Sequence, residues 1–383
     1  MCYHYFGVKK MNKIDNSNSI TNLSNSILKH FGIKCFHPSI KEIDEKLKNK
    51  KKIVVFLFDA MGKVVLEKHL KEKSFFRSHI IKNITSVIPP TTVASTSSFL
   101  SGKYPIENGW LGWTLYFKEI DKNVNVFPNV DDETGEKIEG GNIMEKYCHY
   151  KNIATLINEK KKKNIANLIY GYPVDKENKK TRKINTFIKY AYETANKNDE
   201  SFTYAYWVYP DAYMHKKGVN NFTVHHNIKQ IQRLIKKYSS KNKDVATLII
   251  ADHGMIDVNF NDINEHPDLV DTLIRNTSIE KRTMNFFVKE DKKDLFKELF
   301  NKYYGNYYTL LSKEEALEQN IFGEGKPHPK SLDFIGDFIA LANSNFSLEL
   351  KTEKSMKKKF VFKGHHAGNT LDEMMISVIG INL

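Results

Sequence analysis

Residues 53–59 have the sequence IVVFLFD, six apolar residues that end at an aspartate. This run predicts a core strand, and the spacing after it predicts a helix over 64–70. Further apolar runs and helical patterns predict strands over 166–170, 203–208 and 246–251, and helices over 151–162, 183–195 and 224–239. This β-α-β-α order predicts an α/β fold with a doubly wound, mainly parallel sheet and helices on both faces.

The segments outside this alternation predict the domain organisation. Residues 1–50 show helical spacing and are interpreted as an N-terminal helical extension of a catalytic domain over 51–383. Residues 118–150 are polar and turn-rich, so we expect them to form a connection that passes over the side of the domain with the active site. The sequence pattern changes at about 280–345, where the regular β-α alternation ends. This segment predicts a small inserted cap, with a strand over 285–288, a helix over 292–303 and a strand over 337–342.

The chain of 383 residues has a formal net charge of +14, which raises the alternative of a non-catalytic protein that binds nucleic acid through a basic surface. Only five of the 59 basic residues are arginine, and lysine and asparagine recur together, a pattern typical of an AT-rich genome. Lysine-rich runs such as 48–52 and 160–163 are typical of solvated linkers or helix ends. Charge alone therefore does not establish nucleic-acid binding, but it favours an anionic substrate.

The chain shows no sign of a secreted, disulfide-bonded or membrane-spanning protein. Cys2, Cys35 and Cys148 are widely spaced and form no CxxC pair, which argues against a disulfide framework or a thiolate zinc site. Residues 1–19 lack the apolar segment of a signal peptide, and no run of 18 apolar residues occurs. We therefore expect a soluble, cytoplasmic protein.

Side chains that commonly bind metals lie beside the apolar runs of the chain. They are Asp59, Asp211, His215, Asp252, His253, His365 and His366. Because strand ends on one edge of a parallel sheet converge, these distant residues can meet there. Carboxylate and imidazole together are the ligands of hydrolytic Zn²⁺, with Mn²⁺ as an alternative. The sequence thus predicts a metal-dependent hydrolase.

A hydroxyl group lies where a proline-terminated loop is followed by a predicted helix over 92–100. Pro89 and Pro90 end the preceding element, which places Thr92 at the helix N-terminus, where free N–H groups and the helix dipole favour an anion. Metal coordination would activate this hydroxyl as a nucleophile. Taken alone, a threonine in this position is more commonly a helix N-cap than a nucleophile. The presence of several groups of metal-ligand residues elsewhere in the chain favours the role of nucleophile for Thr92.

Five elements occur in an order that resembles a known family. They are Asp59; the 89–102 segment with Gly102-Lys103-Tyr104-Pro105 and Gly109; Tyr209-Pro210-Asp211 with His215 and Gly218; Asp252-His253-Gly254-Met255; and Gly364 with His366. Together they resemble the alkaline phosphatase superfamily, in particular its type I phosphodiesterase/nucleotide pyrophosphatase branch. The resemblance extends from about residue 53 to the C-terminus.

This resemblance implies two divalent metal ions, normally zinc, and a two-step reaction. By position, one metal would be held by Asp59, Thr92, Asp252 and His253, and the other by Asp211, His215 and His366. Spacing supports the second set independently, because residues four apart on a helix share one face. Thr92 would attack phosphorus, the alcohol or phosphate would leave, and water would hydrolyse the phosphothreonyl intermediate.

Two positions bear on the substrate. Trp113 lies at or next to the place where this family usually has an asparagine that donates to the phosphate, and its indole would suit a planar group such as a nucleobase. Core packing of Trp113 is an equal alternative. The Gly-x-His spacing of the family selects His366 as the ligand, which leaves His365 to support the site or to face the substrate. We therefore expect a nucleotide-type phosphodiester or pyrophosphate substrate.

The closest rival is a phosphomonoesterase or mutase of the same superfamily, which would need extra cationic groups for a dianionic phosphoryl group. None of the five arginines lies near a motif, and this favours diesters. The oligomeric state stays open.

Overall fold

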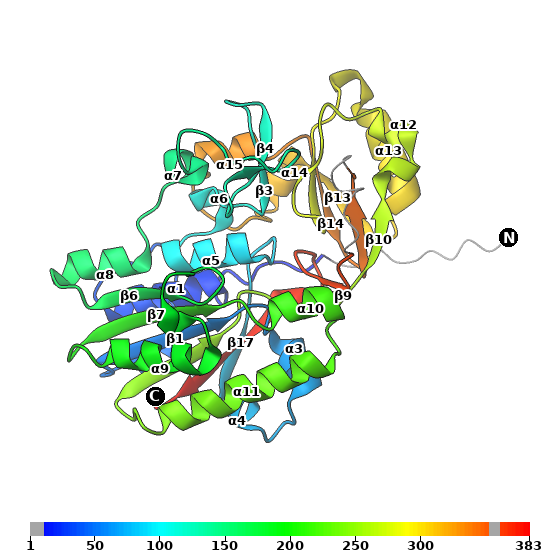
Figure 1. Cartoon of the computed structure of the whole chain (residues 1–383). Coiled ribbons are helices and arrows are strands. Elements are labelled where there is room, and N and C mark those ends of the chain that lie inside the picture. The colour runs from blue at the N-terminus through cyan, green and yellow to red at the C-terminus, as the bar shows by residue number, and fades with distance from the viewer. Residues whose placement is uncertain (1–10, 352–360) are drawn as a thin grey trace.

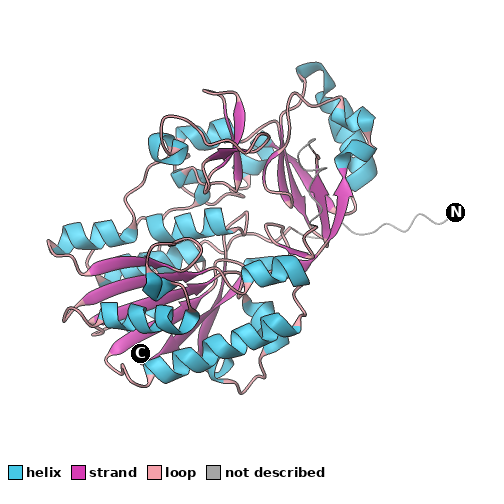
Figure 2. Ribbon diagram, in the orientation of Figure 1, coloured by secondary structure: helices cyan, strands magenta, loops and turns pink. Residues whose placement is uncertain are grey.

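The computed structural model describes residues 11–351 and 361–383, which form a lower lobe and an upper lobe (Figure 1). The lower lobe contains the large sheet with helices packed on it, and the upper lobe contains shorter strands and helices (Figure 2). The two lobes meet above α5 (Thr92–Ser101), the helix that begins at the predicted nucleophile.

The lower lobe is built on a six-stranded sheet. Its strand order is β2-β17-β8-β1-β7-β6, with bounds Ile80–Thr85, Met375–Ile381, Val245–Ile250, Lys52–Phe58, Ser201–Trp207 and Ala166–Tyr170. Strands β8, β1, β7 and β6 are parallel, whereas β17 pairs antiparallel with both β8 and β2. The predicted mainly parallel α/β sheet is thereby confirmed.

Helices cover both faces of this sheet (Figure 1). One face carries α5 together with α1 (Ile20–His30) and α8 (Ile153–Lys161), and the other carries α3 (Lys63–His69), α9 (Ile184–Ala195) and α11 (Phe222–Ser239). The strands β1 and β8 are buried almost throughout, because helices shield them on both sides. The expected strands and helices of this lobe agree with the structure to within two residues at each end.

The described part of the expected N-terminal extension belongs to this core. Helix α1 packs against α5, and the apolar side chains of Ile20, Leu23 and Ile27 are fully buried. The short helix α2 (Lys41–Leu47) packs on α1. Residues 1–10 of the expected extension lie outside the described residues.

The upper lobe contains a seven-stranded sheet drawn from two segments of the chain. Its order is β13-β14-β12-β11-β3-β4-β5, with bounds Tyr308–Ser312, Phe338–Ala342, Thr283–Phe286, Ser278–Ile279, Thr114–Phe117, Lys122–Asn125 and Val130–Asp131. The cap expected at about 280–345 contains β12 to β14, but four of the seven strands come from residues 114–131 and 278–279. The strands β3 to β5 are two to four residues long and partly polar, so they give little apolar signal.

The remaining elements are short, apart from the 12-residue helix α13 (Lys293–Tyr304). They are the helices α4 (Phe75–Ser78), α6 (Pro105–Asn108), α7 (Ile143–Tyr147), α10 (Asp211–Lys217), α12 (Pro267–Val270), α13 (Lys293–Tyr304), α14 (Lys313–Glu318), α15 (Pro329–Phe334) and α17 (Leu371–Met374), the 3-10 turns Lys179–Thr181, Ile263–Glu265 and Glu290–Lys292, and the strands β9 (Ile256–Asp257), β10 (Asn259–Asp262), β15 (Phe346–Glu349) and β16 (Gly364–His365). Across residues 11–351 and 361–383, no helix has the length and apolar character needed to cross a membrane.

Candidate active site

The predicted ligand segments converge at the carboxyl edge of the large sheet. Asp59 follows β1 directly, Asp252 follows β8, and Asp211 begins α10 just after β7. His366 comes from the loop before β17. Because β17 runs antiparallel to β8 and its last residues pair with β8, the first residues of β17 lie at and beyond the carboxyl end of β8. A hydrogen bond of 2.8 Å from the Gly254 amide to the Glu373 carbonyl joins these two ends.

One group of ligand-type side chains surrounds the predicted nucleophile. Ligand atoms of Asp59, Asp252 and His253 all lie within 4.8 Å of one another. The Thr92 hydroxyl oxygen lies 3.4 Å from each Asp59 carboxylate oxygen and 3.3 Å from His253 Nε2. The structure therefore brings together all four residues that the resemblance assigns to one metal.

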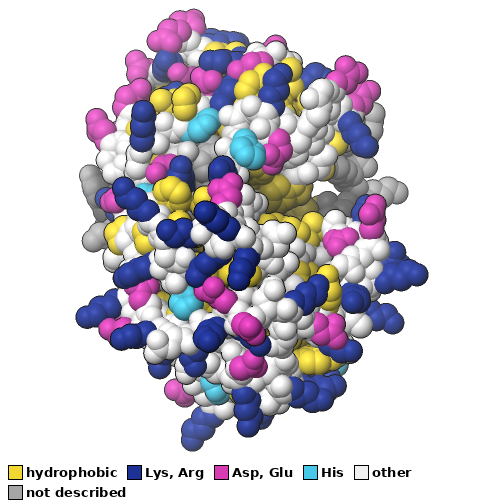
Figure 3. Space-filling model, turned by 90° about the vertical axis from the view of Figure 1, so that its left-hand side faces the viewer, with side chains coloured by type: hydrophobic (Ala, Val, Ile, Leu, Met, Phe, Trp, Pro, Cys, Tyr) yellow, Lys and Arg dark blue, Asp and Glu magenta, His cyan; other side chains and the backbone are white. Residues whose placement is uncertain are grey.

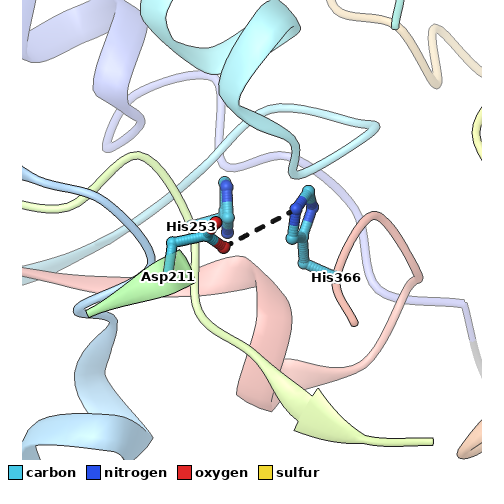
Figure 4. Close-up of side chains that lie close together, drawn as sticks. All are labelled: Asp211, His253 and His366. Atoms are coloured by element: carbon cyan, nitrogen blue, oxygen red, sulfur yellow. Dashed lines mark ion pairs between the residues drawn. The ribbon is translucent and has the colours of Figure 1, made fainter. Parts of the chain in front are cut away.

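A second group lies beside the first. Asp211, His253 and His366 also have ligand atoms within 4.8 Å of one another, and His366 Nε2 is 3.8 Å from Asp211 Oδ1 (Figure 4). His215 Nε2 is 3.3 Å from the same Asp211 oxygen. Because His253 belongs to both groups, the two groups form one continuous site. The division of ligands between two metals stays a prediction.

Backbone carbonyls orient two of the histidines. The Nδ1 atoms of His215 and His253 lie 2.8 Å from the carbonyl oxygens of Gly364 and Gly254, which leaves each Nε2 facing the site. This is the arrangement by which proteins fix a ligand imidazole, since the second ring nitrogen is held by a hydrogen bond.

Hydrogen bonds from the protein also fix one oxygen in each of two carboxylates. Asp252 Oδ1 accepts the amides of Ala60 and His253, each at 3.0 Å. Asp59 Oδ2 accepts the hydroxyl of Tyr206, a residue of β7. In each carboxylate, one oxygen is thus fixed by the protein.

The electrostatics of the cluster indicate that a positive charge belongs in it. Burial, followed by repulsion from Asp252 and Asp211, raises the pKa of Asp59 well above its usual range. Burial raises the pKa of Asp211 to about 7, and burial lowers the pKa of His215 to about 4. Three buried carboxylates beside neutral imidazoles suit a divalent cation, which needs ionised acids and unprotonated histidines.

Unpartnered polar atoms support the same conclusion. Asp211 Oδ1, Asp252 Oδ2 and His366 Nδ1 are buried and accept or donate no hydrogen bond within the described part of the chain. A buried carboxylate oxygen without a hydrogen-bond donor is costly. Asp211 Oδ1 and Asp252 Oδ2 lie 3.3–3.8 Å from imidazole Nε2 atoms, an arrangement in which a cation can bind oxygen and nitrogen together. The residues present therefore fit divalent metal ions.

Thr92 is the first residue of α5, and Thr91 precedes it as the N-cap. The alternative of Thr92 as the N-cap is therefore wrong. The Thr91 hydroxyl does not cap the helix but donates to Glu280 Oε1 at 2.7 Å. Residues 93–101 are all buried, whereas Thr92 is half-buried at the wall of a cavity. The free N–H groups at this helix end suit phosphate oxygens.

A cavity of about 1200 Å³ lies over the cluster and is lined by both lobes. Aromatic side chains form much of its wall: Trp110, Trp113, Phe127, Tyr150, Tyr170 and Tyr206. Trp113 is 41% exposed, and its ring centroid lies 5.9 Å from that of Phe127, so the core-packing alternative for Trp113 is wrong.

His365 lies beside the second group and is 6% exposed. It lines the cavity, and its ring centroid is 5.3 Å from those of both His215 and His366. In this location His365 can either support the neighbouring histidines or face a substrate in the cavity.

Several residues of the site carried no signal in the sequence. Glu280, at the edge of the cap, reaches the loop that precedes the nucleophile, and Tyr206 stood inside an aromatic run without a motif. Arg282 was expected to lie far from every motif, yet it packs against Gly368, two residues after His366. Arg282 is fully buried and forms a bidentate ion pair with Glu373, so it is not available to bind phosphate.

The sheet, the Asp/His cluster at its carboxyl edge and the hydroxyl at a helix N-terminus together are the arrangement of a metal-dependent hydrolase. The model of one family, described as type I phosphodiesterase/nucleotide pyrophosphatase, matches residues 53–369. The chain belongs to this family, which is part of the alkaline phosphatase superfamily and a class of two-metal-ion enzymes. It is therefore a phosphodiesterase/pyrophosphatase enzyme, which excludes the non-catalytic alternative.

Solved structures agree in fold. The murine ectonucleotide pyrophosphatase/phosphodiesterase 5, as an inactive threonine-to-alanine variant in complex with AMP, has a TM-score of 0.61 and 16% identity over 86% of this chain and 87% of that one. The same murine protein without that substitution (TM-score 0.60, 16%, 85% and 87%) and its human counterpart (0.60, 16%, 86% and 87%) are similar. No curated protein matches the chain in sequence.

Proposed function

We propose that this enzyme hydrolyses phosphodiester or pyrophosphate bonds of nucleotide-type substrates through a phosphothreonyl intermediate on Thr92, with two zinc ions as cofactors and Mn²⁺ as the alternative. The observation that carries this proposal is the position of the Thr92 hydroxyl. It lies 3.3–3.4 Å from Asp59 and His253 and at the N-terminus of α5. A nucleophile and an anion-binding helix end are thus in one place.

We assign both steps to residues of the chain. Thr92 Oγ1 loses its proton to solvent and forms a bond to phosphorus, while the bond from phosphorus to the leaving oxygen breaks and that oxygen departs with the bonding electron pair. The N–H groups at the start of α5 hold the phosphoryl oxygens during this transfer. In the second step a water molecule attacks phosphorus and gives up a proton, the bond from phosphorus to Thr92 Oγ1 breaks, and Oγ1 takes up a proton to restore the hydroxyl. When bound, two divalent cations would lower the pKa of the attacking hydroxyl and stabilise charge on the attacking and leaving oxygens.

Asp59, Asp252 and His253 would hold one metal together with Thr92, and Asp211, His215 and His366 would hold the other. The buried oxygens without a hydrogen bond on Asp211 and Asp252, and the position of His366 Nε2 at 3.8 Å from Asp211, support this set. His365, whose ring centroid lies 5.3 Å from those of both His215 and His366, would support these ligands or meet the substrate.

The cavity supports a nucleotide-type substrate. Its exposed Trp113 stands near Phe127 and offers a face on which a planar base can stack. The murine relative was solved in complex with AMP, and we carry this preference to the present chain as part of the proposal.

The charges at the cavity favour diesters over phosphomonoesters. Lys281 lines the cavity, but its ammonium group is paired with Glu349 at 2.6 Å. Arg282 is buried in its pair with Glu373. Lys176 also lines the cavity and has no ion pair among the described residues, so a dianionic phosphomonoester would meet one unpaired lysine here. Basic and acidic side chains are also interspersed over the face in Figure 3, which shows no single basic track for nucleic acid.

The test is a substrate panel on protein reconstituted with Zn²⁺ or Mn²⁺. Bis-p-nitrophenyl phosphate, p-nitrophenyl phosphate, nucleoside triphosphates and dinucleotides would be compared, with products separated by chromatography. We expect cleavage of the diester and of nucleotides with release of nucleoside monophosphate, and loss of both activities after prolonged EDTA treatment. Preference for p-nitrophenyl phosphate would favour the phosphomonoesterase alternative, and activity indifferent to EDTA would refute the proposed mechanism.

A further inference from the structure

Glu280 connects the two lobes at the active site. It follows β11 in the cap, and it is half-buried at the cavity wall. Its Oε1 atom accepts two hydrogen bonds, from the Thr91 hydroxyl at 2.7 Å and from the Trp113 amide at 3.0 Å. One carboxylate oxygen thus links the residue before the nucleophile to the aromatic wall of the cavity.

The backbone next to Glu280 has a left-handed conformation that close packing holds in place. Ile279 has a φ of 71°, a left-handed conformation that is strained for a β-branched residue. Close packing holds it there: Ile279 is fully buried and paired with Thr114, and a Cβ atom on Gly112 would approach the Ile279 carbonyl oxygen to 2.7 Å. The Glu280 amide donates to the Thr283 carbonyl at 3.0 Å, which closes a tight turn.

The residues after Glu280 attach the same turn to the other side of the site. Arg282 pairs with Glu373, and Glu373 Oε1 also accepts the Gly368 amide at 2.7 Å. The Thr283 hydroxyl donates to the carbonyl of Ala367, the neighbour of His366. The turn 280–283 therefore contacts both the nucleophile loop and the loop that carries His366.

We propose that Glu280 is a positioning residue, which sets the distance between Thr92 and the Trp113 wall of the cavity through its bonds to Thr91 and Trp113. This inference rests on the proposed role of Thr92. A strained backbone held against two loops of the active site is the kind of device that positions reacting groups at a cost in local stability. Glu280 acts through its neighbours and does not need to touch the substrate.

The proposal predicts different effects on kcat for two substitutions of Glu280. Glu280→Ala removes both bonds, and a displacement of about 1 Å at the nucleophile lowers kcat about tenfold to a hundredfold. Glu280→Gln keeps an oxygen acceptor of the same shape, so kcat should stay within about threefold of the wild type. Metal content should be unchanged in both variants, since Glu280 contacts none of the proposed ligands.

Asp337 provides a matched control in the same lobe. Its carboxylate also accepts a backbone amide, that of Val288 at 2.8 Å, and it pairs with Lys293 at 2.9 Å, but it does not line the cavity. Asp337→Ala should lower the melting temperature and leave kcat at the wild-type level.

Two readouts on the zinc-loaded enzyme test the proposal: kcat for the best substrate of the panel, and hydrogen exchange in the peptide that contains the Trp113 amide. We expect faster exchange and lower kcat in Glu280→Ala, with both restored in Glu280→Gln. Loss of kcat in Glu280→Gln equal to that in Glu280→Ala would overturn the proposal, because the charge and not the position would then matter. Faster exchange with unchanged kcat in Glu280→Ala would overturn it as well. The exchange readout needs no substrate, so a wild type inactive on the whole panel would refute the proposed function separately.

Discussion

At the scale of single residues, the two adjacent threonines give the sharpest prediction. Thr92→Ala should lower kcat by several orders of magnitude, because it removes the nucleophile, while metal content stays nearly intact. Thr92→Ser keeps a hydroxyl and should retain part of the rate. Thr91→Ala should lower kcat by less than about tenfold, since it removes one hydroxyl, which donates to Glu280, and leaves the Trp113 amide bonded to Glu280. An inactive Thr91→Ala beside an active Thr92→Ala would show that the nucleophile is assigned wrongly.

Tyr206 and Tyr204 form a second matched pair, two residues apart on β7. The Tyr206 hydroxyl donates to Asp59, so Tyr206→Phe should weaken metal binding about tenfold to a hundredfold, as loss of a partner that orients a ligand commonly does. The buried Tyr204 hydroxyl has no hydrogen-bond partner in the described part of the chain, so Tyr204→Phe should leave metal binding unchanged. Competition with a chromophoric chelator measures both constants, and equal effects would contradict the role of Tyr206.

Glu280 also predicts a pH dependence of stability. Burial raises its pKa from 4.5 to about 7, so the folded protein binds this proton more tightly than the unfolded chain does. Its contribution to stability is therefore lost as pH rises from 4.5 through 7. The melting temperature of Glu280→Gln should rise relative to that of the wild type between pH 6 and pH 8. A difference that stays constant between these pH values would show that the carboxyl titrates normally.

At the scale of elements, the strands β1, β7 and β8 were predictable because they are buried on both faces and form continuous apolar runs in the sequence. The strands β3 to β5 were not, since they are short and partly polar. Strand β3 is stabilised by pairing with β11 from a distant segment, and β4 and β5 extend the sheet from β3. The ligand motifs lie at the ends of predictable strands, and this made the cluster predictable as well. Glu280 could not be predicted, because its contacts depend on how the cap folds over α5.

Helix α1 gives a prediction at this scale. Its apolar face lies against α5, and Ile27 is fully buried. Ile27→Ala should lower the free energy of unfolding by about 2–5 kcal/mol, through the lost burial and the cavity that remains. Lys29→Ala, on the exposed side of the same helix, should change it little. Chemical denaturation measures both, and a small effect of Ile27→Ala would contradict a structural role for the N-terminal helix.

At the scale of the whole molecule, the two lobes are joined by buried charges at the active site. Arg282 from the cap and Glu373 from the large domain are both fully buried, and Glu373 holds the loop after His366. Removing one member of such a pair leaves an unpaired buried charge, which destabilises strongly. The stability of the lobes and the position of a proposed metal ligand are therefore set by the same contacts.

Metal removal should destabilise the whole molecule, and more so at higher pH. Without metal, burial raises the pKa of Asp211 to about 7 and that of Asp59 well above its usual range, so the folded state retains protons that the unfolded chain has released. The metal-free protein therefore loses stability as pH rises from about 4 through 7 and beyond.

The metal-loaded protein avoids this loss, because cations take the place of these protons. His215 contributes no slope above its ordinary value of 6.5, since its pKa is lowered by burial and both states are neutral there. Between pH 6.5 and pH 8, the gap in melting temperature between zinc-loaded and EDTA-treated protein should widen, and calorimetry at the two pH values measures it. In Asp211→Asn the widening should be smaller, because one of the titrating carboxyls is gone. A gap that narrows with pH would mean that these carboxylates are not metal ligands.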